Sequence, residues 1–106
     1  GDSLEKCIKA LENENIDVIG TNCTLGSHDM VDLSQQALSL TDTPISVKPN
    51  AGQPRIEGLK TFYDQPIKDF VTDIHKMINL GVKIVGGCCG TSPQTISEIR
   101  KILDTN

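Results

Sequence analysis

The strongest constraint on the fold is an alternation of short β-branched runs with helical segments. The runs IDVIG (16–20), PISVKPN (44–50) and VKIV (82–85) have the length and composition of buried strands. Apolar residues recur at helical spacing before, between and after these runs. The resulting order, α-βα-βα-βα over residues 1–106, predicts an α/β domain with a parallel sheet covered by helices.

Four apolar stripes define the expected helices. They contain Leu4, Cys7, Ile8 and Leu11; Met30, Leu33, Ala37 and Leu40; Ile67, Phe70, Val71, Ile74, Met77 and Ile78; and Ile96, Ile99 and Leu103. Ser27 and Ser92 are placed to cap the second and fourth helices, and Pro93 occupies the first position of the fourth. Gly81 is expected to end the third helix. Residues 51–60, rich in Gly and Pro, are expected to form a loop.

Charge and cysteine usage exclude several classes of function. Ten basic and fourteen acidic residues give a formal charge of -4 without a basic cluster, so we expect no nucleic acid partner. No signal peptide and no apolar run of about 18 residues is present, so we expect no membrane partner. The four cysteines lack the pattern of a disulfide-stapled secreted scaffold, which predicts reduced thiols and a cytoplasmic location.

The most unusual residues lie at the C-terminal ends of the three expected strands. These residues are Asn22 and Cys23, Pro49 and Asn50, and Cys88 and Cys89. In parallel α/β folds, active sites are built at this edge of the sheet. Neighbours on a regular strand point to opposite faces, but Gly86, Gly87 and Gly90 allow both sulfurs of the Cys88–Cys89 pair to turn to one side.

Three converging thiolates from Cys23, Cys88 and Cys89 suit zinc, and three protein ligands leave one position open, as in catalytic zinc sites. Three thiolates and Zn²⁺ sum to a charge of about -1, so a thiol bound at the open position would remain a good nucleophile. Such a site suits alkylation of a thiol better than hydrolysis. Asn50 is a candidate for binding substrate or a sulfur, or alternatively a turn residue.

Three motifs resemble a known family. GTNCTLG (20–26), KPNAG (48–52) and VGGCCGTSP (85–93) are similar to the C-terminal part of the homocysteine S-methyltransferase family, most like the homocysteine-binding barrel of cobalamin-dependent methionine synthase. The resemblance implies the last three strands and flanking helices of a (β/α)₈ TIM barrel. It implies zinc on Cys23, Cys88 and Cys89, and methyl transfer to homocysteine to form methionine. The donor would be cobalamin bound elsewhere in the parent protein, a sulfonium compound or betaine.

A whole barrel of this kind needs roughly 250 residues, so the resemblance covers only part of one. Strands one to five are then missing, and the exposed sheet edges favour self-association.

Two other functions stay open from the sequence. In the first, the chain is a non-catalytic zinc-binding or assembly module, inactive without the missing strands, whose fourth ligand comes from His28 or a second chain. In the second, Cys88 and Cys89 act in thiol–disulfide exchange, although a C-x-x-C motif is absent. Cys7 lies on an apolar stripe and is predicted to be a core residue.

Overall fold

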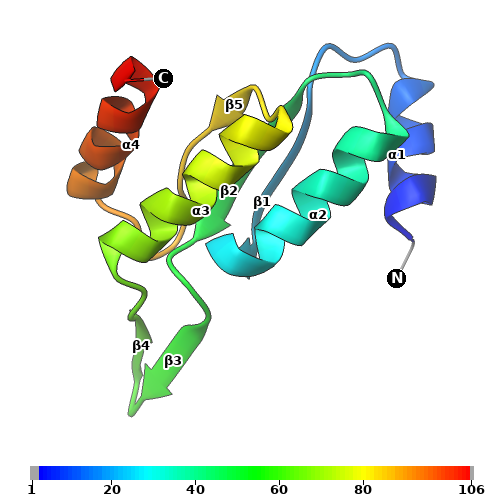
Figure 1. Ribbon diagram of the computed structural model, residues 1–106. Helices are drawn as coiled ribbons and strands as arrows, with labels where there is room; N and C mark the ends of the chain where they lie inside the picture. The colour runs from blue at the N-terminus through cyan, green and yellow to red at the C-terminus, as the bar shows by residue number, and fades with distance from the viewer. Residues whose placement is uncertain (1–2, 106) are drawn as a thin grey trace.

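The computed structural model describes residues 3–105. The elements are α1 (Leu4–Glu12), β1 (Ile19–Gly26), α2 (Ser27–Leu40), β2 (Ile45–Asn50), β3 (Pro54–Glu57), β4 (Lys60–Tyr63), α3 (Ile67–Leu80), β5 (Ile84–Val85) and α4 (Pro93–Thr105), as Figure 1 shows. The alternation of helices and strands is confirmed, with one addition. A hairpin, β3–β4, lies between β2 and α3 and projects away from the rest of the fold (Figure 1).

The predicted parallel sheet is present, with strand order β1-β2-β5. Ile45 and Val47 of β2 are 2% and 0% exposed, whereas the alternating Ser46 is only partly buried and Lys48 is exposed. Because successive strand residues point to opposite faces, the helices cover one face of this sheet and leave the other uncovered within residues 3–105. The strands β1 and β5 form its two edges.

The core is built mainly from α3, as its apolar stripe predicts. Phe70, Ile74 and Met77 are at most 1% exposed, and they pack with Met30 of α2 and Val47 of β2. Gly81 ends α3 with φ of 120°, a backbone angle that favours glycine, and its N–H donates to the Ile78 carbonyl.

The strand boundaries differ from those expected. The first strand was predicted at 16–20 but spans Ile19–Gly26, because the polar segment after Gly20 continues to pair with β2. The third is shorter than predicted, Ile84–Val85. The expected loop at 51–60 instead contains most of the β3–β4 hairpin, whose two strands pair from Pro54↔Tyr63 to Glu57↔Lys60 around a two-residue turn.

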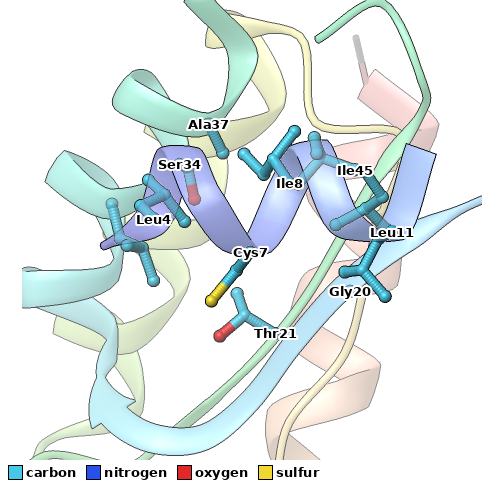
Figure 2. A pocket seen from close by; sticks show the side chains of 11 residues that line it. Leu4, Cys7, Ile8, Leu11, Gly20, Thr21, Ser34, Ala37 and Ile45 are labelled. Atoms are coloured by element: carbon cyan, nitrogen blue, oxygen red, sulfur yellow. The ribbon is translucent and has the colours of Figure 1, made fainter. Parts of the chain in front are cut away.

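Two local predictions are wrong. Ser27 does not cap α2: Gly26 holds the cap position, and the fully buried Ser27 hydroxyl instead donates to Asp73 Oδ2 of α3 at 2.7 Å. Cys7 is exposed rather than part of the core, and of the first stripe only Ile8 is fully buried. Cys7 lines an apolar hollow of about 200 Å³ between α1, α2 and β1, where its sulfur points towards Thr21 (Figure 2).

The outer helices bury less of their stripes than predicted. Ile99 of α4 is 4% exposed, but Ile96 and Leu103 are 49% and 39% exposed. In the described part of the chain α1 contacts mainly α2, and α4 contacts mainly α3. Each outer helix therefore has a neighbour on one side only. Among residues 3–105, no helix combines the length and the apolar composition needed to cross a bilayer.

The predicted cap of α4 is confirmed. Ser92 Oγ accepts from the Thr95 N–H at 3.3 Å, and Thr95 Oγ1 accepts from the Ser92 N–H at 3.2 Å, which is a reciprocal capping arrangement.

We expect Ser92→Ala to lower the free energy of unfolding by about 1 kcal/mol, because the Thr95 N–H loses its acceptor. Urea denaturation measures this change. The matched control is Ser97→Ala, at an exposed position inside α4, where alanine favours the helix slightly. Equal stability of the two variants would contradict the capping role.

Candidate metal centre

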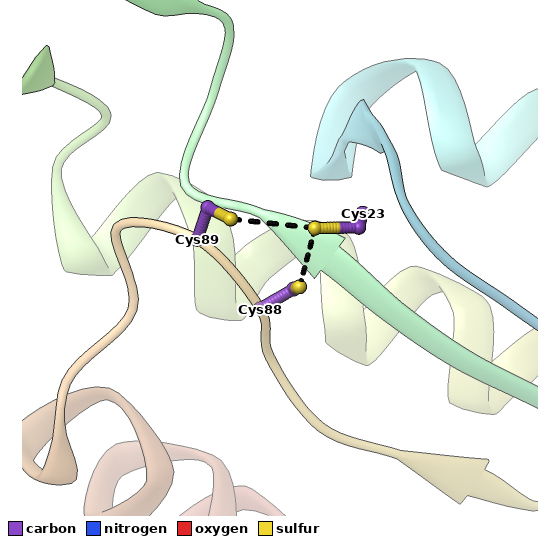
Figure 3. A group of neighbouring side chains, drawn as sticks. All are labelled: Cys23, Cys88 and Cys89. Atoms are coloured by element: carbon purple, nitrogen blue, oxygen red, sulfur yellow. Dashed lines mark hydrogen bonds between the residues drawn. The ribbon is translucent and has the colours of Figure 1, made fainter. Parts of the chain in front are cut away.

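Three cysteine sulfurs lie together at the C-terminal edge of the sheet (Figure 3). Cys23 Sγ is 2.6 Å from Cys88 Sγ and 3.3 Å from Cys89 Sγ, and all three lie within 4.8 Å of one another. Within the described residues, no other group of three or more Cys, His, Asp or Glu side chains is so arranged. The structure therefore brings together the three residues that the sequence selects, although Cys23 and Cys88 are 65 residues apart in the chain.

Cys23 reaches the cluster through an unusual backbone. Its φ is 64°, the left-handed region that a non-glycine residue adopts at a cost of about 1 kcal/mol or more. The pairing of β1 with β2 also shifts register between Asn22 and Gly26. This bulge re-aims the Cys23 side chain, as bulges next to functional sites commonly do.

Cys88 and Cys89 are held by the end of β2. The Cys88 N–H donates to the Pro49 carbonyl at 3.0 Å, and the Ala51 N–H donates to the Cys89 carbonyl at 2.9 Å. Of the three glycines expected to free this segment, only Gly90 has positive φ, 83°. The unusual backbone angles therefore lie at Gly90 and at Cys23 itself, and not at Gly86 or Gly87.

Asn50 connects the two cysteine segments. Its side chain is 6% exposed; its Nδ2 donates to the Cys23 carbonyl at 2.6 Å, and its Oδ1 accepts from the Cys89 N–H at 3.2 Å. Both ends of the amide thus fix the backbone that carries sulfurs. Direct contact of Asn50 with a substrate stays a prediction.

Tyr63 is a site residue that the sequence does not reveal. It ends β4, and a Cβ built on Gly90, the residue after Cys89, would lie 2.3 Å from Tyr63 Cβ. Desolvation raises the pKa of this phenol above its ordinary value, and the proximity of Cys89, Cys23 and Cys88 raises it further. The phenol is therefore protonated at neutral pH. The only sequence signal for Tyr63 was the short strand that ends on it, and the Gly and Pro residues nearby made that segment look like a loop.

His28 does not belong to the cysteine cluster. It is exposed near the start of α2 and lines a separate polar hollow that Gln65 and Asp73 also line. A fourth ligand from this chain's own His28 therefore finds no support in the geometry.

The cluster fits a soft or borderline ion. Tetrahedral zinc with bonds of about 2.3 Å separates its sulfur ligands by about 3.8 Å, within the span of the three sulfurs after small rotations. All four cysteines are free thiols, and Cys23 and Cys89 are exposed, so one side of the cluster is open to a further ligand. These three residues could hold a metal ion with an accessible coordination position.

The chain is similar to known proteins of one family. The profile described as "Homocysteine S-methyltransferase" matches residues 1–103. The chain is 36% identical to homocysteine S-methyltransferase 2 of Arabidopsis thaliana, over 97% of this chain and 32% of that protein. It is 34% identical to a selenocysteine methyltransferase of Astragalus bisulcatus (99% and 32%) and 31% identical to methionine synthase of Mycobacterium leprae (93% and 8%). The chain thus spans about a third of the length of the first two relatives. Its sequence places it in the homocysteine S-methyltransferase family, as the three motifs predict.

Proposed function

We propose that this chain is the zinc-binding part of an enzyme that transfers a methyl group to the sulfur of homocysteine and forms methionine. The observation that carries the proposal is the convergence of Cys23, Cys88 and Cys89 on one point with an open side. Membership of the family supports the choice of homocysteine as acceptor. Related enzymes named for selenocysteine act on a heavier analogue of the same thiol group.

For the fold, we propose that residues 1–106 are the last three strands and flanking helices of a homocysteine-binding (β/α)₈ barrel. The parallel strand order and the helical cover on one face support this assignment. The uncovered face carries Ser46 and Lys48, and in a closed barrel this face would point towards the interior. The edges β1 and β5 are where further strands, or a second copy of the chain, would pair.

In this proposal the three cysteines are the ligands and Asn50 keeps their segments in place. A zinc ion held there supplies Lewis acidity that keeps a bound thiol deprotonated at neutral pH. The cysteine sulfurs contribute negative charge, so the homocysteine sulfur stays electron-rich. Its lone pair forms the new bond to the methyl carbon; the bond from methyl to donor breaks, and that electron pair leaves with the donor. Cobalamin bound elsewhere, a sulfonium compound and betaine all fit this step.

The test is X-ray absorption at the zinc edge on the purified chain, with homocysteine and with homoserine. We expect about one zinc per chain bound by three sulfurs, and a fourth sulfur after homocysteine is added. Homoserine is the matched control, because oxygen replaces sulfur in an otherwise identical molecule.

Two results would count against the proposal. A zinc ion with a nitrogen ligand and no response to homocysteine would indicate a closed, non-catalytic assembly site. A folded protein that binds no zinc, and in which Cys88 and Cys89 interconvert between thiol and disulfide, would indicate redox chemistry instead.

A further inference from the structure

The two adjacent cysteines lie at the start of a tight turn. The Thr91 N–H donates to the Cys88 carbonyl at 3.2 Å, which closes a four-residue turn over residues 88–91. Gly90, at the third position of this turn, has φ of 83°, as a type II turn requires there. The pair therefore leaves the alternation of a strand, in which its side chains would point to opposite faces. Both of its sulfurs instead lie beside that of Cys23 (Figure 3).

The peptide unit between Cys88 and Cys89 is held at both of its polar groups. Its carbonyl accepts a second hydrogen bond, from Thr91 Oγ1 at 2.7 Å, and its N–H donates to Asn50 Oδ1 at 3.2 Å. Because the peptide is planar, its orientation sets the ψ torsion of Cys88 and the φ torsion of Cys89. These two torsions determine the angle between the Cα–Cβ bonds of the pair. Thr91 and Asn50 together therefore fix the directions in which the two side chains leave the backbone.

Gly87 makes room for the Thr91 side chain. A Cβ built on Gly87 would lie 2.5 Å from Thr91 Oγ1, 2.7 Å from its Cγ2 and 2.8 Å from its Cβ. Gly87 does not have positive φ, so close approach rather than backbone angle accounts for glycine at this position. The threonine thus packs on the residue before Cys88 while its hydroxyl binds the Cys88 carbonyl. A valine would fill the same space, so packing alone does not account for the hydroxyl.

We propose that Thr91 is a positioning residue of the metal site, whose hydroxyl holds the Cys88–Cys89 peptide so that both sulfurs point to one ion. The inference rests on the proposed function, because it concerns the same zinc site. Loss of a residue that supports metal ligands lowers metal affinity about 10- to 100-fold. Without the hydroxyl, the Cys88 carbonyl still accepts from the Thr91 N–H, so we expect an effect at the lower end of this range.

Zinc affinity in two variants of Thr91 tests this role, with a chromophoric chelator as competitor. Valine keeps the shape of the side chain and removes the hydroxyl, whereas serine keeps the hydroxyl and removes the methyl group. We expect Thr91→Val to bind zinc about tenfold more weakly and Thr91→Ser to bind it as tightly as the wild type. A packing role predicts the reverse order. That order, or equal affinity of all three proteins, would overturn the proposal.

Thr72→Val is the matched control. Thr72 Oγ1 also donates to a backbone carbonyl, that of Lys68 at 2.9 Å, but Thr72 is exposed on α3 and lies outside the cysteine cluster. We expect this variant to keep the zinc affinity of the wild type, and an equal loss in both valine variants would contradict the proposal. Visible spectra of the proteins saturated with cobalt(II) separate ligand geometry from stability, because these bands depend on the arrangement of the ligands. We expect a band shift in Thr91→Val only.

Trivalent arsenic tests the inference without zinc. Arsenious acid condenses with three converging thiols: three sulfur–arsenic bonds form, three arsenic–oxygen bonds break, and three water molecules leave. We expect Thr91→Val to bind arsenic more weakly than the wild type, and equal binding would overturn the role of Thr91. A wild type that binds arsenic but no zinc would count against the proposed function alone. A wild type that binds neither would overturn both, because its sulfurs would not converge.

Discussion

Replacing Cys88 by serine is expected to lower zinc affinity by more than about 100-fold, because the loss of residues that only support metal ligands already lowers affinity about 10- to 100-fold. A serine hydroxyl keeps nearly the shape of the side chain but offers no thiolate to the ion. Competition with a chromophoric zinc chelator at constant pH measures the affinity.

Cys7→Ser is the matched control for this change. The same atom is replaced in the same chain, but Cys7 is exposed on α1 and lies outside the cysteine cluster. We expect the control to bind zinc as tightly as the wild type. A similar loss of affinity in both variants would mean that the ion binds thiols non-specifically.

Gly90→Ala is expected to lower the free energy of unfolding by about 2–4 kcal/mol, combining overpacking with a strained backbone angle. The new methyl group would approach Tyr63 Cβ to 2.3 Å and Ala51 Cβ to 3.0 Å. These atoms are next to the backbone, so rotation of a flexible side chain cannot relieve the contact. The positive φ of 83° adds a cost that remains even if the neighbours move.

Gly58→Ala separates the two causes. Gly58 has φ of 63°, but a Cβ built there meets nothing within 4 Å. We expect this variant to lose only about 1 kcal/mol, the cost of the left-handed angle. Urea unfolding of both variants gives the comparison. Equal decreases in the free energy of unfolding would show that the contact with Tyr63 does not contribute to the effect of Gly90→Ala.

The local sequence predicted those parts of the fold that local interactions determine. The α3 stripe, the glycine that ends α3 and the Ser92 cap all involve residues within a few positions of one another. The partner of Ser27 is Asp73, 46 residues further along, so a pattern of helix-start residues suggested a cap where the fold makes a tertiary hydrogen bond. The hairpin was missed because its Gly and Pro residues are also typical of loops.

The candidate site could likewise be predicted only in part from the sequence. Parallel strands bring their C-terminal ends to one edge, so cysteines that follow two strands could be placed together without a structure. The left-handed angle of Cys23 and the double hydrogen bond of Asn50 could not be predicted, because they depend on how segments far apart in the sequence pair and pack. Tyr63 depended on a hairpin that the sequence did not indicate.

The double hydrogen bond of Asn50 determines where the cysteine cluster can adapt. Because one amide binds the backbone at both Cys23 and Cys89, the two segments cannot separate unless one of these partly buried hydrogen bonds breaks. The cysteine side chains, by contrast, can rotate about their first torsion between staggered positions. The main chain at the cluster is therefore rigid, whereas the cysteine side chains can move. Ions of different radius can be bound by changing the cysteine rotamers while the backbone keeps one conformation.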